Sequence, residues 1–499
     1  VSMKREWKFG EISLVGLKRH KRTYILFCQS LLWLMLKTYI LQVLGRFSGY
    51  EELDIKVVDK TITTKLVCEA IKKAVVEDAE IILYVPESLI ILLIDDFEEV
   101  LDYLRNIQSL EKLFKEEVLN SNLLGEDFKL RVIKSAGLYR EKSNRYKLYF
   151  DNSLNNIIIY LFLDLLTFRD ARIIADISTG QNFYVIALLE ALRHILTYRK
   201  LENIFNREWR TEITLSTIPP VIESGSNKRT PRLVNFSELD VKVFFEYPLK
   251  TITERGKTLI SLGDFISQEL DEDRRVQKIG ELIEKFGRDF KKIKEILQLC
   301  KISFNAIKYN APLCFYEPEI INLKKYDVDE ALNLLKRILE YVEEERRISI
   351  GEDNNVKIER TPLARTTIIN TFLTISLFKS IRESLNHLNT KRNPTLTELR
   401  GSFDKIYSIL GLQLNQTFLQ REINNIIRVS DNLKDGEEKL YGELLGEQPG
   451  RPQDPKRNFF AHAGLTYDTV LVRKELGEVR VRYEEEQFKK IREYLSRPL

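Results

Sequence analysis

The chain has 499 residues, enough for about three domains that each bury a core. Its formal net charge is only +4, which argues against adhesion to nucleic acid through one global positive field, so a polyanion contact should be a local patch. The four cysteines include no Cys-x-x-Cys pair, so neither a disulfide framework nor a zinc site is indicated. No acidic pair or His-x-x-x-His arrangement stands out, and we expect any chemistry to be independent of metal.

The N-terminal part of the chain contains an apolar segment, residues 24–44, that is long enough to cross a membrane. Polar residues interrupt it, so we do not expect a span there: Gln29, Ser30, Lys37 and Gln42. The folded pattern begins at Lys37, with Met35 shortly before it. Residues 1–36 are therefore predicted to be an N-terminal extension, of which residues 1–34 either belong to the protein or are translated from upstream of its natural start.

From Lys37 onward, short apolar runs alternate with amphipathic stretches, which is the signal of a parallel sheet with crossover helices. Strands are predicted at residues 39–44, 81–85, 128–133, 172–177, 212–217 and 241–246. Helices are predicted at residues 63–76, in a long stretch ending near 119, and at 154–166 and 182–196. The fold class expected for residues 37–252 is therefore α/β, with a Rossmann-like, doubly wound sheet.

Past residue 252 the periodicity becomes mostly helical. Helices are predicted at residues 265–299, 328–345, 366–388 and 396–427, with a polar joint at 351–355. Residues 469–473 and 479–483 alternate as a β-hairpin, and a last helix covers 484–495. We predict a mainly α-helical C-terminal part, divided into a helical linker region at 253–350 and a final domain at 351–499.

A short helix near the C-terminus is well delimited by its own sequence. Asp454 is a good N-cap, and Pro455 suits the first helical position. Gly464 suits the left-handed residue that ends a helix. We therefore expect a short helix here, with Phe459 and Ala463 packed behind it.

This helix carries an Arg and a His five positions apart. At about 100° per residue, Asn458 and His462 lie on nearly one face, and Arg457 lies on its flank. Such a group could bind a phosphodiester, because Arg can hold phosphoryl oxygens and His can move protons near neutral pH. Chance is the alternative, since an Arg and a His at this spacing occur often in a chain of this length. The cap and the basic loop at 451–457 favour a site.

Two further loops follow predicted strands and have the composition of an anion site. One contains Arg46 and Ser48 between two glycines, and the other, residues 176–182, precedes a helix. Ligands of open α/β sheets bind at the carboxyl ends of strands where the strand order reverses, and hydroxyls, glycine and helix N–H groups together hold anions. An ordinary capped turn is the alternative interpretation. Neither loop is a dinucleotide fingerprint or a P-loop.

Two motifs of this chain are similar to those of a known family. The run Asp176-Ile177-Ser178-Thr179-Gly180-Gln181-Asn182 resembles the motif of CARF domains, which sense cyclic oligoadenylates, and residues 84–89 are similar to such domains as well. The run Arg457-Asn458-x-x-x-His462-Ala-Gly resembles the signature of HEPN ribonucleases. In this order, the two motifs resemble the CARF-HEPN auxiliary ribonucleases of type III CRISPR-Cas systems.

The resemblance implies a cytoplasmic homodimer or higher homo-oligomer, without membrane association, in which two CARF domains share one symmetric cyclic oligoadenylate. We expect cyclic tetra-adenylate as this allosteric activator, and no other cofactor. Residues of the two loops would hold the ring: Arg46, Ser48, Asp176, Ser178, Thr179, Gly180 and Asn182.

The HEPN resemblance implies a composite active site that cleaves single-stranded RNA without metal. The RNA 2′-OH would attack the adjacent phosphorus, leaving a 2′,3′-cyclic phosphate and a 5′-OH. Arg457 would stabilise the developing phosphorane charge, His462 would assist proton transfer or position the 2′-OH, and Asn458 would orient the pair. Two alternatives remain open: a CARF-containing, ligand-controlled transcriptional regulator, and a ring nuclease that degrades cyclic oligoadenylate.

Overall fold

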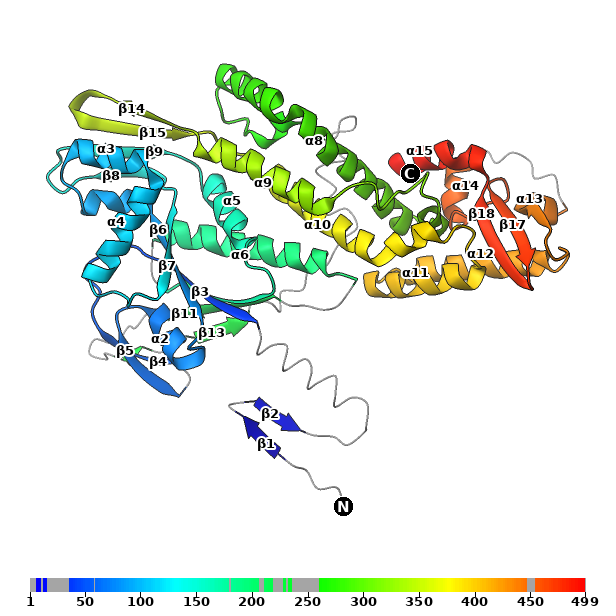
Figure 1. The fold of residues 1–499 in the computed structure, drawn as a ribbon, viewed down its shortest axis with the longest axis horizontal. Helices are drawn as coiled ribbons and strands as arrows, with labels where there is room; N and C mark the ends of the chain where they lie inside the picture. Colours follow the sequence, from blue (N-terminus) through cyan, green and yellow to red (C-terminus); the bar gives the residue numbers. More distant parts are fainter. Residues whose placement is uncertain are drawn as a thin grey trace. The chain divides into compact units, whose positions relative to one another are not determined.

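The computed structural model in Figure 1 describes residues 36–57, 59–178, 181–205, 211–218, 260–446 and 454–498. It also describes the backbone of four short strands: β1 (Glu6–Phe9), β2 (Ile12–Val15), β12 (Lys228–Arg229) and β13 (Arg232–Asn235). The chain forms two compact units, fewer than the roughly three domains that its length suggests.

A six-stranded sheet in the order β13-β11-β10-β3-β6-β7 organises the first unit. Apart from β13 its strands are parallel and lie close to the predicted positions: β3 (Lys37–Val43), β6 (Glu80–Pro86), β7 (Phe128–Ile133), β10 (Ala171–Asp176) and β11 (Glu212–Thr217). β3 and β6 are almost continuously buried, as expected of strands covered on both faces. The prediction of an α/β fold with a parallel sheet is confirmed.

The order of the strands reverses in the middle of this sheet. β3 comes first in the chain and is followed by β6 and β7 on one side, whereas β10 and β11 lie on the other side. β3 and β10 are parallel neighbours, with Gln42 opposite Asp176. The loops that follow these two strands therefore leave from the same edge of the sheet, at the position where open α/β sheets bind ligands.

The helices of the first unit follow the predicted stretches, with one correction. They are α2 (Val67–Val75), η1 (Glu87–Leu92), α3 (Phe97–Arg105) and α4 (Ile107–Asn120), and α6 (Asn182–Glu202) begins here. The helix predicted at 63–76 starts later, because residues 60–64 form β5 (Lys60–Thr64), which pairs with β4 (Leu53–Val57). Three threonines and an isoleucine favour a strand there, since β-branched side chains are restricted in a helix.

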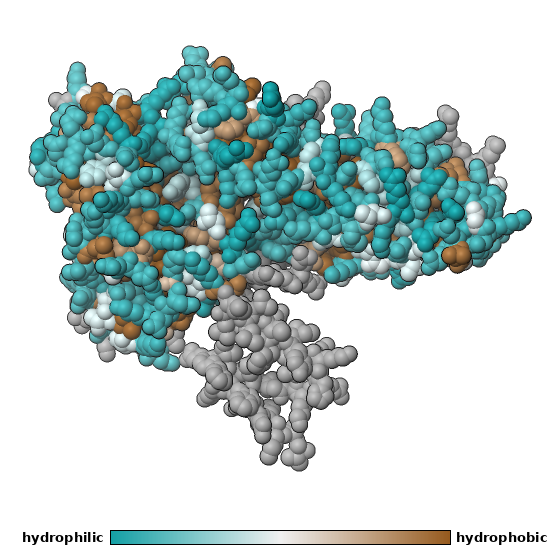
Figure 2. Space-filling model, viewed as in Figure 1, coloured by the Kyte–Doolittle hydropathy of each residue, from teal (hydrophilic) through white to brown (hydrophobic). Residues whose placement is uncertain are grey.

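Two other sequence predictions concern the borders of this unit. The strand predicted at 241–246 lies outside the described residues, and the strand beside β11 is the antiparallel β13. Of the apolar segment at 24–44, the described part contributes to β3. No helix in the part of the chain that the structure describes is long and apolar enough to cross a membrane. Hydrophilic residues dominate the surface seen in Figure 2.

The second unit is mainly helical. Its long helices α8 (Glu272–Lys308), α9 (Val328–Glu344) and α10 (Arg365–Leu385) pack against one another, and α5 (Leu154–Leu165) packs against α10. α8 begins seven residues after the predicted start, because Asp271 caps it by accepting a hydrogen bond from the backbone N–H of Arg274. The helices at 328–345 and 366–388 were predicted almost to the residue.

Strands interrupt the helical pattern twice in this unit. A four-stranded sheet has the order β14-β15-β9-β8, formed by β8 (Gly137–Arg140), β9 (Lys147–Asp151), β14 (Arg346–Ile350) and β15 (Asn355–Arg360). The polar joint predicted between helices at 351–355 is instead the turn between β14 and β15, whose polar and apolar residues alternate. The second sheet has the order β16-β17-β18: β16 (Glu438–Leu440), β17 (Val470–Glu475) and β18 (Glu478–Tyr483).

The C-terminal helices surround this second sheet. The single helix predicted at 396–427 is two helices, α11 (Leu396–Leu410) and α12 (Gln413–Ser430), because Gly411 adopts a left-handed φ of 70° and ends the first. The predicted hairpin and last helix are confirmed. The remaining helices are α13 (Tyr441–Leu444), α14 (Pro455–Ala461), α15 (Phe488–Ser496), η2 (Leu262–Phe265), η3 (Pro312–Tyr316), η4 (Glu352–Asn354), η5 (Asn386–Thr390) and η6 (Glu485–Gln487).

Candidate active site and ligand site

The helix α14 has the limits that its sequence predicts. The side chain of Asp454 accepts a hydrogen bond from the backbone N–H of Arg457 at 2.9 Å, and Pro455 occupies the first turn. The backbone N–H of His462 donates to the carbonyl of Asn458 at 3.1 Å, so His462 is the C-cap. Gly464 follows with a left-handed φ of 70°. These local contacts place Arg457, Asn458 and His462 on consecutive turns of one short helix.

Aromatic packing fixes the rear of α14. Phe459 is 1% exposed, and its ring lies 6.1 Å from that of Tyr483 and 5.8 Å from that of Tyr494. A Cβ atom on Gly464 would lie 2.8 Å from the hydroxyl of Tyr483 and 3.1 Å from the Cα of Ala311, so this turn can pack only with glycine. The polar face of the helix is therefore held against a rigid support.

His462 is paired with a carboxylate on another helix. Its Nδ1 lies 3.3 Å from Oε1 of Glu422 on α12, and the side chains of His462 and Glu422 are 45% and 7% exposed. The hydrogen bond with Glu422 raises the pKa of His462, while partial burial and the positive charge of Arg421 oppose the rise. Because Glu422 holds Nδ1, Nε2 is free to exchange a proton with a substrate.

The neighbours of His462 on α14 are equipped to receive a charged or polar ligand. Arg457 is exposed and forms no ion pair with a residue that the structure describes. The Nδ2 atom of Asn458 is buried and finds no hydrogen-bond partner among the described residues. An unpaired buried donor costs free energy, which points to a function for it. Cation, amide and imidazole together can bind and protonate an oxyanion or phosphodiester.

The first unit holds the other predicted site, at the reversal of strand order. Asp176 ends β10 and is fully buried. Its Oδ1 accepts hydrogen bonds from the hydroxyls of Ser178 at 2.7 Å and Ser216 at 3.1 Å. The Ser178 hydroxyl in turn accepts from the backbone N–H of Ile218 at 2.8 Å. The loops after β10 and β11 are thereby tied together.

Burial decides what Asp176 can do. Desolvation raises the pKa of its carboxyl to about 6, against the hydrogen bonds from the two serines. Its Oδ2 is buried without a hydrogen-bond partner among the described residues. Asp176 does not face solvent. Its carboxyl group is therefore placed to hold the side chain of Ser178, and not to contact a ligand that approaches from solvent. Asn182 is exposed at the start of α6, whereas Thr179 and Gly180 lie outside the described residues.

The loop after β3 presents its cation to solvent. Arg46 and Ser48 are both exposed, and Nη2 of Arg46 donates to the carbonyl of Gly49 at 2.8 Å. The guanidinium lies 5.4 Å from the centre of the Tyr50 ring. These contacts use few of the five guanidinium N–H groups, so Arg46 can still donate to an anion.

Two family models match separate parts of this chain. The model described as CRISPR system endoribonuclease Csx1, CARF domain, matches residues 39–217, and the corresponding HEPN-domain model matches residues 412–485. Together they cover just over half of the chain. The chain belongs to the CARF-HEPN auxiliary ribonucleases of CRISPR systems. No curated protein matches its sequence.

The two matches contain the two sites. The CARF match includes both loops at the strand reversal, and the HEPN match includes α14 together with Glu422. CARF-HEPN proteins are a family of ligand-regulated ribonucleases of CRISPR systems. The roles of individual residues and the domain limits 37–252, 253–350 and 351–499 stay predictions.

The sequence reasoning missed Glu422. This residue lies on α12 among the buried positions Leu419, Ile423 and Ile426. A carboxylate on the apolar face of an amphipathic helix is a signal that a partner cation is present in the fold. That signal does not tell which residue is the partner, because His462 is 40 positions further along the chain.

Proposed function

We propose that this protein is a cyclic-oligoadenylate-activated, metal-independent endoribonuclease for single-stranded RNA in type III CRISPR antiviral defence. The observation that carries the proposal is His462, half-exposed and held by the buried Glu422, on the same short helix as Arg457, which pairs with no carboxylate of the described residues. The match of the HEPN model to this segment supports it.

In the proposed reaction, the RNA 2′-oxygen forms a bond to the adjacent phosphorus while the bond from phosphorus to the 5′-oxygen breaks. The proton of the 2′-OH is removed and the leaving 5′-oxygen gains one, giving a 2′,3′-cyclic phosphate and a 5′-OH. Nε2 of His462 moves a proton or positions the 2′-OH, and Arg457 stabilises the charge on the phosphoryl oxygens. Asn458 donates its free N–H groups to the substrate and orients it. The nucleophile is part of the substrate, so the step needs no metal.

A second copy of the chain would complete the active site. Next to Glu422, the exposed face of α12 presents Leu414 and Phe418, which are 72% and 46% exposed. Burying these side chains against their counterparts is favourable, and a two-fold contact brings the same surface of both copies together. Two copies of α14 would then supply two Arg457 and two His462 side chains to one cleft.

Cyclic oligoadenylate would bind to the first unit, with cyclic tetra-adenylate as the expected ring. Its phosphates would meet Arg46, Ser48 and the N-terminus of α6 at Asn182, and Asp176 would hold Ser178 in place. Thr179 and Gly180 complete the proposed cradle. Binding of the ring shifts the equilibrium toward the active arrangement of the enzyme. The size of this shift is set by the difference between the ring's affinities for the active and inactive arrangements.

The test combines substrate, activator and product analysis. Purified protein is incubated with labelled RNA, with and without cyclic tetra-adenylate or hexa-adenylate, and the RNA ends are identified. We expect RNA cleavage only with a ring, products that end in 2′,3′-cyclic phosphate, and no loss of activity in EDTA. Inhibition by EDTA would contradict the metal-independent step.

The same experiment separates the other two functions. Loss of the ring without loss of RNA identifies a ring nuclease and overturns the ribonuclease proposal. Loss of neither leaves the ligand-controlled regulator, which would then bind DNA in a ring-dependent manner.

A further inference from the structure

A basic groove lies in the second unit, outside both family matches. It is an open hollow of about 310 Å³ lined by α8, by residues 322–326 and by α15. The matched HEPN region ends at residue 485, before α15 begins. Membership of the family therefore assigns nothing to this surface.

The groove carries an unbalanced positive charge. Four of its nine lining residues are cations: Lys291, Lys294, Lys325 and Arg492. None of the four forms an ion pair with a carboxylate of the described residues, and all but Lys294 are exposed. The one acid that lines the groove, Glu295, accepts a hydrogen bond from the hydroxyl of Tyr326. Four cations without an ion-pair partner among the described residues, around one hollow, make a site for a polyanion.

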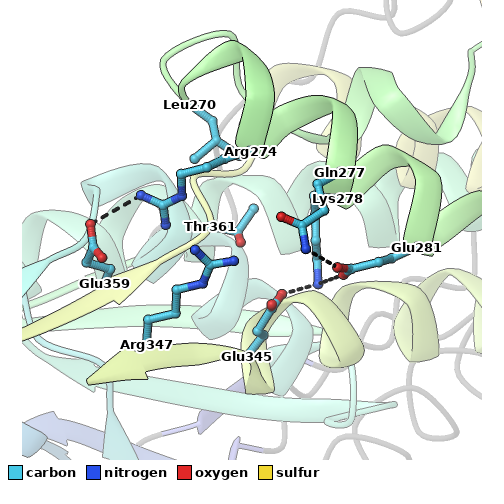
Figure 3. Close-up of a pocket in the computed structure, with 9 residues that line it drawn as sticks. All are labelled: Leu270, Arg274, Gln277, Lys278, Glu281, Glu345, Arg347, Glu359 and Thr361. Atoms are coloured by element: carbon cyan, nitrogen blue, oxygen red, sulfur yellow. Dashed lines mark hydrogen bonds and ion pairs between the residues drawn. The ribbon is translucent and has the colours of Figure 1, made fainter. Parts of the chain in front are cut away.

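A second charged pocket of the same unit shows what a balanced cluster looks like. In Figure 3, Arg274 pairs with Glu359, and Lys278 pairs with Glu281 and Glu345. The carboxylates there already satisfy two of the three cations. That pocket is a network within the fold, and the contrast shows that the cations of the groove lack such partners.

The positive charge continues along α8 beyond the hollow. Lys291, Lys294, Gln298 and Lys301 recur at helical spacing and share one face of the helix. Gln298 donates a hydrogen bond to the hydroxyl of Ser496 at 3.3 Å, which fixes α15 beside α8. Burial and the neighbouring Arg497 lower the pKa of Lys301. The groove therefore runs along the seam between the two helices.

This seam lies on the opposite side of α15 from the candidate active site. Tyr494 of α15 packs against Phe459 of α14, with 5.8 Å between ring centres. Arg492 precedes Tyr494 by two positions, about 200° around the helix, so it points to the other side. The groove and the polar face of α14 therefore lie on opposite sides of the Phe459–Tyr494 contact. Only an RNA long enough to pass around α15 would contact both.

We propose that the groove formed by Lys291, Lys294, Lys325 and Arg492 binds the phosphodiester backbone of the single-stranded RNA substrate outside the cleavage site. The proposal rests on the function proposed above and adds a second contact surface to it. The cations hold successive phosphates without reading sequence, and Tyr326 offers a ring on which a base can stack. The groove raises affinity for long RNA and leaves the chemical step unchanged.

An acidic protein is the competing occupant, and the lining argues against it. Specific protein interfaces have an apolar centre with aromatic anchors inside a polar rim. Here Leu299 is the one aliphatic side chain in the lining, and it is 5% exposed. A chain of phosphates needs charge and no apolar centre, so RNA is the better match.

The test measures the affinity of the inactive His462→Ala protein for RNA at several salt concentrations. A groove variant carries Lys→Gln at Lys291, Lys294 and Lys325 together with Arg492→Gln, which keeps most of each side chain. A control variant carries Lys→Gln at four exposed lysines of the first unit: Lys56, Lys60, Lys73 and Lys112. Similar thermal unfolding midpoints of all proteins, and recovery of binding when the groove lysines are instead replaced by Arg, exclude a folding defect.

The groove variant should bind a long single-stranded RNA at least about tenfold more weakly. The slope of log affinity against log salt should also become shallower by about 3, because each of the four lost phosphate contacts contributes about 0.7 to that slope. The control should match the parent protein. In the active background, cleavage of an RNA too short to reach the groove should keep its kcat/KM.

The outcomes separate this proposal from the ribonuclease assignment. Unchanged affinity and salt slope in the groove variant, with cleavage by the wild type intact, overturn the groove alone. If the wild type fails to cleave RNA but the groove variant still loses affinity, the ribonuclease function fails and the groove stands as an RNA site. Loss of binding to an acidic protein, with RNA binding intact, identifies the competing occupant and overturns the proposal.

Discussion

Each of the two candidate sites contains a buried carboxyl group, and the two groups behave differently because their partners differ. Among the described residues Asp176 has neutral partners, the hydroxyls of Ser178 and Ser216 and the backbone of Ser178, and burial raises its pKa to about 6. Glu422 has the imidazole of His462 as partner, and there the pKa of the histidine rises. At Asp176 the neutral donors do not offset the cost of burying the charge, whereas at Glu422 the partner can itself become positively charged.

The partners indicate a separate role for each carboxyl. Asp176 is shielded from solvent and links the loops after β10 and β11, so its role in the candidate ligand site is to hold these loops in place. Glu422 is shielded as well, but it acts on a histidine that is 45% exposed and can meet a substrate. In the first unit, the carboxyl of Asp176 holds the loops after β10 and β11 together. In the second unit, the carboxyl of Glu422 raises the pKa of His462.

Removing the imidazole should abolish cleavage without affecting the ring site. His462→Ala should lower the rate of RNA cleavage by about 10³-fold, because a positioned proton-transfer group contributes 10²–10⁴-fold. Cyclic tetra-adenylate binding, measured by calorimetry, should be unchanged. The control is His387→Ala, which alters an exposed histidine of the same unit and should cleave like the wild type. Wild-type cleavage by His462→Ala would remove His462 from the mechanism.

Two glycines with nearly equal φ measure how tightly α14 is packed. At Gly464 a Cβ atom would lie 2.8 Å from the Tyr483 hydroxyl, whereas at Gly477, with φ of 78°, nothing lies within 4 Å. Gly464→Ala should lower the free energy of unfolding by about 4 kcal/mol, from left-handed strain and overpacking. Gly477→Ala should lower it by about 1 kcal/mol, from strain alone. Denaturant unfolding measures both, and equal losses would contradict the packing described for α14.

The buried carboxyl of the first unit should show in the pH dependence of stability. The folded pKa of Asp176, about 6, lies above the unfolded value of an aspartate, so the folded state binds the proton more tightly. The contribution of Asp176 to stability should therefore fall as pH rises from about 4 to about 6, by about 2 to 3 kcal/mol. Asp176→Asn should lack this slope.

The measurement is the difference in unfolding free energy between Asp176→Asn and the wild type across that pH range, in which the other titrating groups cancel. A difference that does not change with pH would show that the carboxyl is not desolvated as the fold indicates.

Neutralising Arg46 should weaken activation and spare the chemistry. Arg46→Gln should raise the cyclic tetra-adenylate concentration for half-maximal cleavage about tenfold, since a hydrogen bond to a charged group is worth about 1.5–3 kcal/mol. The maximal rate with saturating ring should be unchanged. Arg105→Gln alters an exposed arginine of the same unit and should leave activation as it is. A lower maximal rate in Arg46→Gln would place Arg46 in the transmission of the signal.

Removing the charge of Glu422 should shift the pH–rate profile of RNA cleavage and have little other effect on the enzyme. The hydrogen bond with Glu422 raises the pKa of His462, so Glu422→Gln should lower that pKa. The limb of the pH–rate profile that reports His462 should shift to lower pH, whether His462 acts as base or as acid. Glu443→Gln, on the exposed surface of α13, is the control. An unshifted limb would reduce Glu422 to a structural support.

Local sequence signals predicted a large part of this fold. The strands β3, β6 and β7, the helices α9 and α10, and the cap and end of α14 lie where periodicity and capping residues put them. The hairpin β14–β15 was missed because helical stretches surround it, and a polar run fits either a helix joint or a strand turn. Residues 179 and 180 and the strand predicted at 241–246 remain predictions outside the described residues.

The two motifs, their order along the chain and the short helix that carries Arg457 and His462 can be recognised in the sequence alone. These depend on backbone geometry within a few residues, which local side chains dictate. The folded structure is needed to see that Glu422 contacts His462, that Asp176 is buried, and that cations of α8 and α15 line one groove. Those contacts join residues from 40 to about 200 positions apart, and packing of whole helices and sheets, which no local pattern encodes, brings them together.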